Sequence, residues 1–535
     1  ARSTASSRMN SNGGSKSRPR TASTGKAANN GAGPYLIVSF LFVAMFLGLI
    51  AYLVYFNVVR KEEFLNSSYN TRQNNYAERV IRGTIYSADG QELAKTTTDE
   101  NGDEVRTYPF GSLFAQVVGY TGKGNSGLES SYNYMLMESH TSKLKQVKNE
   151  FSDAKNPGDS LYTTLNTTLQ QAAADALDGY RGAVVVLEAK TGRVLANVSN
   201  PVFNPNTIDE DWEALNADDE SGVFLNRGLQ GRYPPGSTFK TAQGLTFLQE
   251  GIITEQSPAF PCSHGFHYGR LTVGCHAHGS PLPLIPAIAT SCNSYFCWGL
   301  FRMFGDRKYG SPQNAITVWK DHMVSQGFGY KLGVDLPGEK RGLIPNAQFY
   351  DKAYRGHWNG LTVISISIGQ GEILSTPLQI ANLGATIANR GYFVTPHIVK
   401  EIQDNQLDSI YRVPRYTTIE KRHYESVVEG MRGAATGGTC RMLSVMVPDL
   451  EACGKTGTAQ NRGHDHSVFM GFAPMNKPKI AIAVYVENGG WGATYGVPFG
   501  ALMMEQYLKG KLSPENELRA EEFSNRVILY GNEER

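Results

Sequence analysis

The apolar run from Tyr35 to Phe56 constrains this chain more than any other stretch, because it contains no charged residue. At about 1.5 Å per residue, one helix of this length crosses the roughly 30 Å hydrocarbon layer of a bilayer. A helix at the surface of a soluble protein has one polar face, whereas this run is apolar on every side. A cleaved signal peptide usually has a shorter apolar core, of about 7–15 residues. We therefore predict a transmembrane helix over residues 35–59.

Charges beside the run predict its orientation. Residues 1–34 are rich in Gly, Ser and Asn and are expected to form a disordered cytoplasmic tail. Their charged residues are all basic: Arg2, Arg8, Lys16, Arg18, Arg20 and Lys26. Because a basic flank stays in the cytoplasm, everything after Arg60 is predicted to lie outside the membrane. The net charge of the whole chain is only +2, which gives no reason to expect nucleic acid as a partner.

At 535 residues the chain is long enough for two or three domains. Residues 60–160 are polar and mixed, and we interpret them as an extracytoplasmic pedestal. Within it, residues 82–94 contain an Asp-Gly turn between two strand-like segments, which predicts a β-hairpin. Residues 161–510 are predicted to form the catalytic body, and residues 511–535 a charged C-terminal tail.

The body shows helical and strand-like patterns at both of its ends. Residues 165–177 have helical apolar spacing with Asn166 as the N-cap, and the region from the middle motif to about residue 435 is mainly helical in pattern. An acidic loop is expected from Asp209 to Glu220. Strands are expected at residues 183–189, 193–198, 455–459, 467–472 and 480–486. Strands supplied by both ends of a domain predict an α+β fold rather than a βαβ fold.

Ser237 and Lys240 are the strongest candidates for nucleophile and base. They follow Pro234, Pro235 and Gly236, which end any earlier helix and allow a new one to begin near the serine. A spacing of three places the hydroxyl and the amine on one helix face, close enough to share a proton. Unpaired backbone N–H groups at a helix start can also bind an oxyanion.

Two further motifs follow in chain order: Ser291-Cys292-Asn293 and Lys455-Thr456-Gly457-Thr458. Each motif has decoys elsewhere in the chain, so no single one is specific. The decoys are Ser23/Lys26, Ser142/Lys145, Ser68-Tyr69-Asn70, Ser131-Tyr132-Asn133 and Lys190-Thr191-Gly192. Only one combination runs in the order that serine D,D-peptidases and β-lactamases show.

These motifs make the chain resemble the penicillin-binding transpeptidase domain. Further short motifs look like those of class B penicillin-binding proteins of the elongation type: Arg82-Gly83, Gly127-Leu128-Glu129, Asn226-Arg227 and Gly369-Gln370-Gly371. The resemblance implies an antiparallel sheet flanked by helices, as in serine β-lactamases and D,D-peptidases, on a membrane-anchored pedestal in the bacterial plasma membrane. It implies no cofactor. Its partners would be D-Ala-D-Ala stem peptides, β-lactams and a polytopic glycan polymerase.

The resemblance also assigns roles to the motif residues. Ser237 would attack the carbonyl between two D-alanines, Lys240 would act as the base, and Ser291 would relay the proton to the leaving D-alanine. Asn293 would hold the substrate amide. Lys455, Thr456, Gly457 and Thr458 would form the strand that binds the terminal carboxylate. An amine from a neighbouring strand would then complete a peptidoglycan cross-link during cell-wall synthesis.

Other classes of function remain open from the residues. Water in place of the amine would make the chain a D,D-carboxypeptidase or a β-lactamase. A β-lactam sensor would need a cytoplasmic effector domain, which residues 1–34 are too short to supply. A silent scaffold should lack a reacting residue, whereas Ser237, Lys240, Ser291 and Lys455 are all present. Roles in elongation and in division are not distinguished.

All six cysteines lie beyond residue 260, in a compartment that permits disulfides. Cys262 with Cys275, and Cys440 with Cys453, could each close a small loop, and free thiols are also possible. A zinc site is the alternative for the first pair, because thiolate and imidazole are ligands that zinc prefers. Its candidate ligands are Cys262, His264, His267, Cys275, His276 and His278.

Overall fold

The computed structural model describes residues 32–60, 64, 78–152, 154–403, 407–461, 463–526 and 528. It divides into two units, residues 1–62 and residues 63–535, which we describe separately. The predicted cytoplasmic tail lies outside the described residues up to residue 31.

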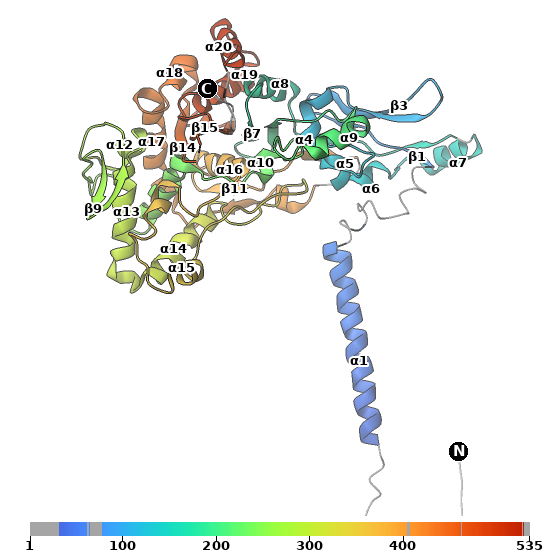
Figure 1. The fold of residues 1–535 in the computed structure, drawn as a ribbon. Helices are drawn as coiled ribbons and strands as arrows, with labels where there is room; N and C mark the ends of the chain where they lie inside the picture. The colour runs from blue at the N-terminus through green and yellow to red at the C-terminus, as the bar shows by residue number, and fades with distance from the viewer. Residues whose placement is uncertain are drawn as a thin grey trace, which may run out of the picture. The chain divides into compact units, whose positions relative to one another are not determined.

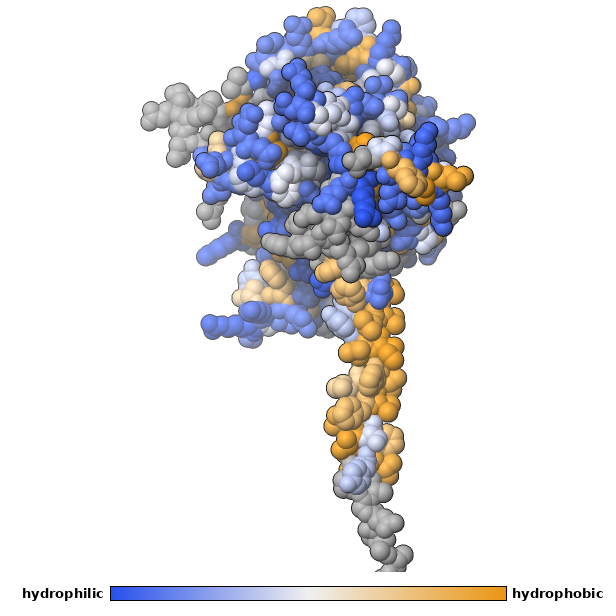
Figure 2. All heavy atoms as spheres, turned by 90° about the vertical axis from the view of Figure 1, so that its right-hand side faces the viewer, coloured by the Kyte–Doolittle hydropathy of each residue, from blue (hydrophilic) through white to orange (hydrophobic). Residues whose placement is uncertain are grey.

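The first unit is a single long helix. Helix α1 (Ala32–Tyr55) continues into a π-helical turn, η1 (Phe56–Arg60). Figure 2 shows apolar residues along its visible length, whereas the visible face of the larger unit is mainly hydrophilic. From Tyr35 to Arg60 this helix is long and apolar enough to cross a membrane.

A five-stranded antiparallel sheet forms the centre of the larger unit, in the order β14-β15-β16-β7-β8. Its strands come from both ends of the body, as the sequence predicts: β7 (Gly182–Glu188), β8 (Val194–Asn200), β14 (Cys453–Ala459), β15 (His466–Ala473) and β16 (Ile480–Val486). Residues on both faces of these strands are buried because helices cover both faces. Strand β14, which carries the Lys455 motif, lies at one edge.

Two layers of helices enclose this sheet. Helices α8 (Thr167–Leu177) and α19 (Gly496–Lys509) pack together on one side, with α20 (Pro514–Ser524) against α8 (Figure 1). Asn166 caps α8, since its Oδ1 accepts the N–H of Leu169 at 2.8 Å. Helix α16 (Pro377–Ala388), buried throughout, packs on β15, β16 and β7 from the other side. The α+β class is thereby confirmed.

A mainly helical lobe follows the nucleophile, as predicted. The short helix α10 (Arg227–Gln230) precedes the nucleophile, which lies in the turn η3 (Gly236–Phe239). The helices that follow are α11 (Lys240–Gln249), α12 (Leu284–Ala289), α13 (Asn293–Gly305), η4 (Arg307–Tyr309), α14 (Pro312–Ser325), α15 (Ala347–Tyr354), η5 (Ile364–Ile368), η6 (Ser409–Tyr411), η7 (Lys421–His423), α17 (Tyr424–Gly437), α18 (Met442–Met446) and η8 (Pro448–Leu450). It also contains a hairpin, β9 (Gly265–Tyr268) with β10 (Leu271–Gly274), and the pair β11 (Tyr392–Val394) and β13 (Pro414–Tyr416), which the sequence did not predict.

The pedestal is tied to the body through a second sheet, in the order β12-β6-β2-β3-β4. Its strands are β2 (Ile85–Tyr86), β3 (Glu92–Thr98), β4 (Glu104–Thr107), β6 (Leu161–Thr163) and β12 (Val399–Ile402), and β1 (Val80–Ile81) pairs with β5 (Asn156–Pro157). The predicted hairpin is β2–β3. The pedestal's helices are η2 (Gly111–Phe114), α4 (Ala115–Val118), α5 (Gly127–Ser131), α6 (Asn133–Leu136) and α7 (Lys143–Phe151).

A buried ion cluster holds the pedestal together. Glu129, which is fully buried, accepts from Arg82 Nε at 2.6 Å and from Arg106 Nε at 2.8 Å. Burial opposes ionisation of Glu129, but Arg106 and Arg82 together hold its pKa below the ordinary value. Gly83 must be glycine here, since a Cβ would lie 1.9 Å from the carbonyl oxygen of Asp159. The Arg82-Gly83 and Gly127-Leu128-Glu129 motifs therefore serve this cluster.

The acidic loop expected from Asp209 to Glu220 is wrong in part. Residues Ile208–Ala217 form helix α9, and the acidic residues are exposed. Asp209, Glu210 and Asp211 lie in its first turn, where negative charge stabilises the positive end of the helix dipole. In the segment predicted as a charged tail, residues Pro514–Ser524 form α20.

Candidate active site

Ser237 lies in the turn η3, directly before helix α11. Gly236 has a φ of +55°, and a Cβ there would lie 2.8 Å from the carbonyl oxygen of Thr458. Its N–H donates to the carbonyl oxygen of Gly369 at 3.0 Å. Only glycine fits this contact. The turn thereby presents Ser237, half-buried, to a cleft of about 760 Å³.

Lys240 is fully buried beneath the serine and is held by the second motif. Its Nζ donates to the Ser291 carbonyl oxygen at 2.7 Å, to Ser291 Oγ at 3.2 Å and to Asn293 Oδ1. Burial lowers the pKa of Lys240 to about 8. A substantial fraction of this amine is therefore neutral near physiological pH and able to accept a proton.

Ser291 lies between two buried amines. Lys455 follows Ser291 in the sequence, whereas Lys240 precedes it. Lys455 Nζ donates to Ser291 Oγ at 2.7 Å. Burial, and then the positive charge of Lys240, hold the pKa of Lys455 well below its ordinary value. Ser291 itself has a φ of +57°, a left-handed conformation that a non-glycine residue adopts at a cost. The second motif is thus held in a strained backbone that directs its hydroxyl to both amines.

The spacing of Ser237 and Lys240 predicts that their side chains share a proton directly. Among the hydrogen bonds of the described residues, none joins Ser237 Oγ to Lys240 Nζ; the amine is bonded to Ser291 and Asn293 instead. Catalytic hydrogen bonds are often loose before substrate binds, so this geometry fits a base that engages the serine in the complex.

Strand β14 forms the opposite wall of the cleft. Gln370 Nε2 donates to the carbonyl oxygen of Thr458 at 3.1 Å, so the Gly369-Gln370-Gly371 motif braces both the nucleophile turn and this strand. Thr456 Oγ1 donates to Thr439 Oγ1 at 2.9 Å. Gly457 packs on the nucleophile segment, where a Cβ would lie 3.0 Å from the carbonyl oxygen of Pro235.

The structure brings the three motifs into one cleft, which Ser237, Ser291, Asn293, Thr456 and Thr458 all line, with Lys240 and Lys455 buried at its base. The decoys that can be located lie elsewhere: Ser142 precedes the exposed helix α7, Asn133 bonds Arg82, and Lys190–Gly192 form the turn between β7 and β8. Ser23/Lys26 and Ser68–Asn70 lie outside the described residues.

Asn293, which is expected to hold the substrate amide, lines the cleft and also bonds to neighbouring residues. Its Nδ2 donates to the Gly274 carbonyl oxygen at 2.7 Å, while Oδ1 accepts from Lys240. Both ends of its amide are thus engaged by the protein. This residue links the base to the end of strand β10.

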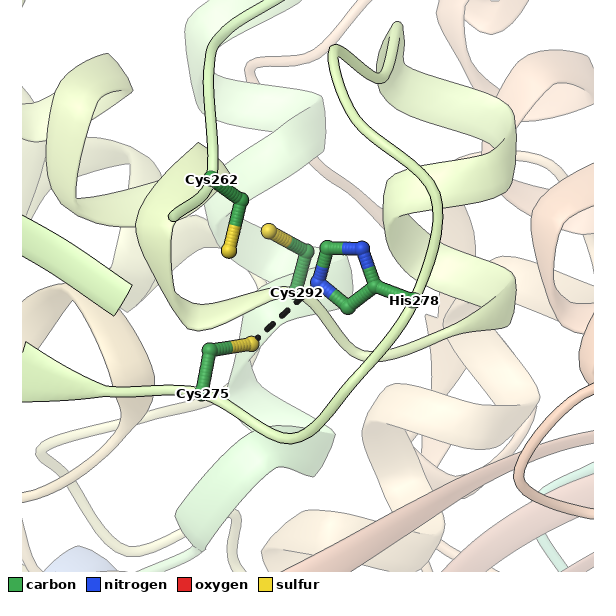
Figure 3. A group of neighbouring side chains, drawn as sticks. All are labelled: Cys262, Cys275, His278 and Cys292. Carbon is green, nitrogen blue, oxygen red and sulfur yellow. Dashed lines mark hydrogen bonds between the residues drawn. The ribbon is translucent and has the colours of Figure 1, made fainter. Parts of the chain in front are cut away.

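Four side chains beside the second motif form a cluster suited to a metal ion. The ligand atoms of Cys262, Cys275, His278 and Cys292 all lie within 4.8 Å of one another (Figure 3). Three thiols and one imidazole are a donor set that structural Zn²⁺ takes in tetrahedral sites. Two of the expected ligands have other partners instead. His267 bonds to Thr272 and Ser263, and His276 bonds to Thr290.

This cluster is joined directly to the catalytic residues. Cys275 Sγ accepts the backbone N–H of Asn293 at 3.3 Å, and Cys292 Sγ caps helix α13 by accepting the N–H of Tyr295 at 3.3 Å. The sequence prediction missed Cys292 as a ligand because that residue falls within the second motif. All six cysteines, including the buried Cys440 and Cys453, are free thiols.

Comparison with known proteins now decides the family. The model of the "Penicillin binding protein transpeptidase domain" matches residues 182–505, and that of the "Penicillin binding protein A dimerisation domain" matches residues 82–161. The chain belongs to the penicillin-binding protein transpeptidase family. The prediction of a class B penicillin-binding protein is confirmed. The dimerisation-domain match covers residues 82–160 of the predicted pedestal and extends one residue beyond it.

Curated relatives agree with this assignment. The chain is 32% identical over 454 residues to the peptidoglycan D,D-transpeptidase MrdA of Acinetobacter baumannii, a match that covers 73% of this chain and 64% of that relative. It is 28% identical over 458 residues to the protein of the same name from Escherichia coli K12, with 73% and 69% covered. The match thus spans less than two thirds of the length of the Acinetobacter relative.

Solved structures share the fold. The chain resembles Pseudomonas aeruginosa PBP2, solved in complex with WCK 5153, with a TM-score of 0.70 and 30% identity, covering 82% of this chain and 98% of that one. It also resembles penicillin-binding protein A from Mycobacterium tuberculosis, solved as an imipenem acyl-enzyme complex, with a TM-score of 0.68 and 25% identity, covering 80% and 99%.

Proposed function

We propose that this chain is a peptidoglycan D,D-transpeptidase that cross-links stem peptides through an acyl-Ser237 intermediate. The observation that carries the proposal is the convergence of the three motifs around Ser291, whose hydroxyl lies 3.2 Å from Lys240 Nζ and 2.7 Å from Lys455 Nζ. Ser291 and the two buried amines can carry protons, and Ser237 lines the same cleft as the nucleophile. Acyl transfer needs these groups together.

The first half-reaction follows from these contacts. Ser237 Oγ bonds to the carbonyl carbon between the two D-alanines, and its proton passes to neutral Lys240. Backbone N–H groups of Ser237 and Thr458 stabilise the oxyanion. The C–N bond then breaks, and Ser291 hands a proton, replaced from Lys240, to the departing amine of D-alanine. Lys455, Thr456 and Thr458 hold the terminal carboxylate of the donor.

The second half-reaction transfers the acyl group to an amine of a neighbouring strand, which completes the cross-link. A β-lactam would acylate the same serine and remain bound. Relatives bear the name peptidoglycan D,D-transpeptidase, and one neighbour is an imipenem acyl-enzyme. Both names support the proposal for this chain.

We further infer that the enzyme lies in the bacterial plasma membrane. Helix α1 would anchor it, with the N-terminus in the cytoplasm and residues after Arg60 outside, where stem peptides are. A polytopic glycan polymerase would supply the glycan strands. We place it in cell elongation, because the curated relatives carry that type's name, MrdA.

We also propose that Cys262, Cys275, His278 and Cys292 bind one Zn²⁺ with a structural role. The ion would cross-link the end of β10 to the start of α13, and so hold Asn293 where its Oδ1 accepts from Lys240. In zinc sites of this kind the ligands are thiolates, and their negative charge is neutralised by the ion.

Labelling with a fluorescent penicillin tests the nucleophile. The full chain should be labelled covalently, whereas Ser237→Ala should not be labelled at all. Ser142→Ala is a matched control, because Ser142 has the same spacing to a lysine but lies outside the cleft. Labelling of Ser237→Ala at the wild-type rate would show that the nucleophile has been misassigned.

A second assay separates a transpeptidase from a carboxypeptidase. Stem peptides incubated with the full chain should yield cross-linked dimers together with released D-alanine. Release of D-alanine without dimers, in the presence of excess acceptor peptide, would make the chain a D,D-carboxypeptidase.

A further inference from the structure

A second hollow adjoins the catalytic cleft. It has a volume of about 680 Å³ and is formed by the turn before β15 and the loop after β16. Asp465 and Trp491 line both this hollow and the cleft that contains Ser237. The two spaces therefore meet at these two side chains.

The backbone at this junction is fixed by hydrogen bonds. Gly490 N–H donates to the Asp465 carbonyl oxygen at 2.7 Å, and Ser467 Oγ donates to the Trp491 carbonyl oxygen at 2.9 Å. Gly492 lies against the catalytic strand, since a Cβ there would be 2.4 Å from the carbonyl oxygen of Gly457. The junction is thus built onto the strand that carries Thr458.

The two side chains differ from the rest of the lining. Trp491 is 66% exposed, although large aromatic residues usually bury most of their surface. Its ring centroid lies 6.4 Å from that of His276, which also lines the cleft. Asp465 is the only carboxylate among the described residues that line either space.

This combination suits an ammonium group. A carboxylate attracts a cation through charge, and the face of an exposed indole attracts it through its quadrupole. A cross-linking enzyme must bind two substrates at one acyl carbonyl, and the second is an amine that is protonated in solution. A cleft for the donor and an adjoining hollow with a cation site match that need.

We propose that Asp465 and Trp491 form the acceptor subsite, which binds the side-chain ammonium of a diamino acid in the acceptor stem peptide. The adjoining hollow then holds the rest of that peptide. This inference rests on the proposed transpeptidase function. In the step it serves, the amine nitrogen bonds to the acyl carbon and the bond from that carbon to Ser237 Oγ breaks. The bound ammonium gives up two protons in this step: the first leaves to solvent as the neutral, nucleophilic amine forms, and the second returns to Ser237 Oγ through Lys240.

The test measures how the acyl-enzyme divides between amine and water. The full-length enzyme is given a stem pentapeptide donor and increasing amounts of a stem tetrapeptide acceptor with a free side-chain amine. The amount of dimer formed is divided by the amount of acyl-enzyme formed. The release of D-alanine measures the amount of acyl-enzyme. We expect Asp465→Asn and Trp491→Ala each to lower this quotient about tenfold at low acceptor concentration, with recovery at high concentration. Loss of the acceptor subsite should therefore appear as a raised KM for the acceptor peptide.

Matched controls are Asp218→Asn and Tyr416→Ala, an exposed acid and an exposed aromatic that line neither space. They should leave the quotient unchanged. A quotient in Asp465→Asn and Trp491→Ala equal to that of wild type would overturn the proposal, as would a fall in D-alanine release as large as the fall in dimer. Failure of the proposed function would look different, because wild type itself would then form no dimer.

Discussion

The rate of acylation should depend on pH through the buried amine of Lys240. Burial lowers its pKa from 10.5 to about 8, because the charged form loses its hydration without gaining a counter-ion of equal strength. This shift corresponds to about 3 kcal/mol in favour of the neutral amine. Since only the neutral amine accepts the Ser237 proton, the rate should rise as pH rises.

The size of the rise follows from the pKa. With a value of about 8, roughly 9% of the amine is neutral at pH 7 and roughly 91% at pH 9. The second-order rate constant for a fluorescent penicillin should therefore increase about tenfold between these values and then level off. It is measured by the appearance of labelled protein over pH 6–9.5, with Lys145→Ala as the control lysine variant.

Stability gives an independent check on the same group. Between pH 8 and 10.5 the unfolded chain keeps the proton on Lys240 while the folded chain has lost it, so the free energy of unfolding contributed by this group rises with pH. A fall in labelling above pH 8 therefore cannot be assigned to Lys240. A rate constant that stays flat from pH 7 to 9, in protein that remains folded, would refute a role for this amine as the base.

Three further results are expected. Gly236→Ala should slow penicillin acylation at least about tenfold, because its φ is +55° and its Cβ would lie 2.8 Å from the Thr458 carbonyl oxygen; labelling at the normal rate would show that the turn can move. Glu129→Ala should lower the free energy of unfolding by about 3–5 kcal/mol in denaturant titrations, since two arginines lose their partner, while the exposed Glu429→Ala should change it little. Elemental analysis of purified protein should find one zinc per chain, and Cys275→Ser should lower both zinc content and melting temperature; metal-free wild type with the same melting temperature would exclude the site.

Much of the fold could be predicted from local sequence patterns. The segments that form β7 and β16 are rich in Val, Ile and Ala. Such segments form buried strands where other elements cover both faces of the sheet. The hairpin β9–β10 was not predicted, because its strands have only four residues each and the cysteines and histidines around them suggested a disulfide loop or a zinc site. Helix α9 was missed for a related reason, since Asp209, Glu210 and Asp211 suggest a solvated loop but also stabilise a helix N-terminus.

The site was predictable as a set of segments but not as a geometry. Motif order identified Ser237, Ser291 and Lys455, because acyl transfer needs these groups together. Spacing alone could not show that Lys240 bonds to Ser291 and Asn293, since a residue three positions away in a turn has several partners within reach. The subsite at Trp491 had no signal in the sequence, as an exposed indole is recognisable only in the fold.

The order of strands in the central sheet has a consequence for how the enzyme is made. Strand β7, near residue 185, pairs with β8 and with β16, near residue 483, so the β7–β8 hairpin has no third strand until nearly the entire body has been synthesised. Contacts this distant in sequence form slowly. A chain that stops before β16 therefore lacks the strand that pairs with β7, and leaves that edge of the β7–β8 hairpin without a partner.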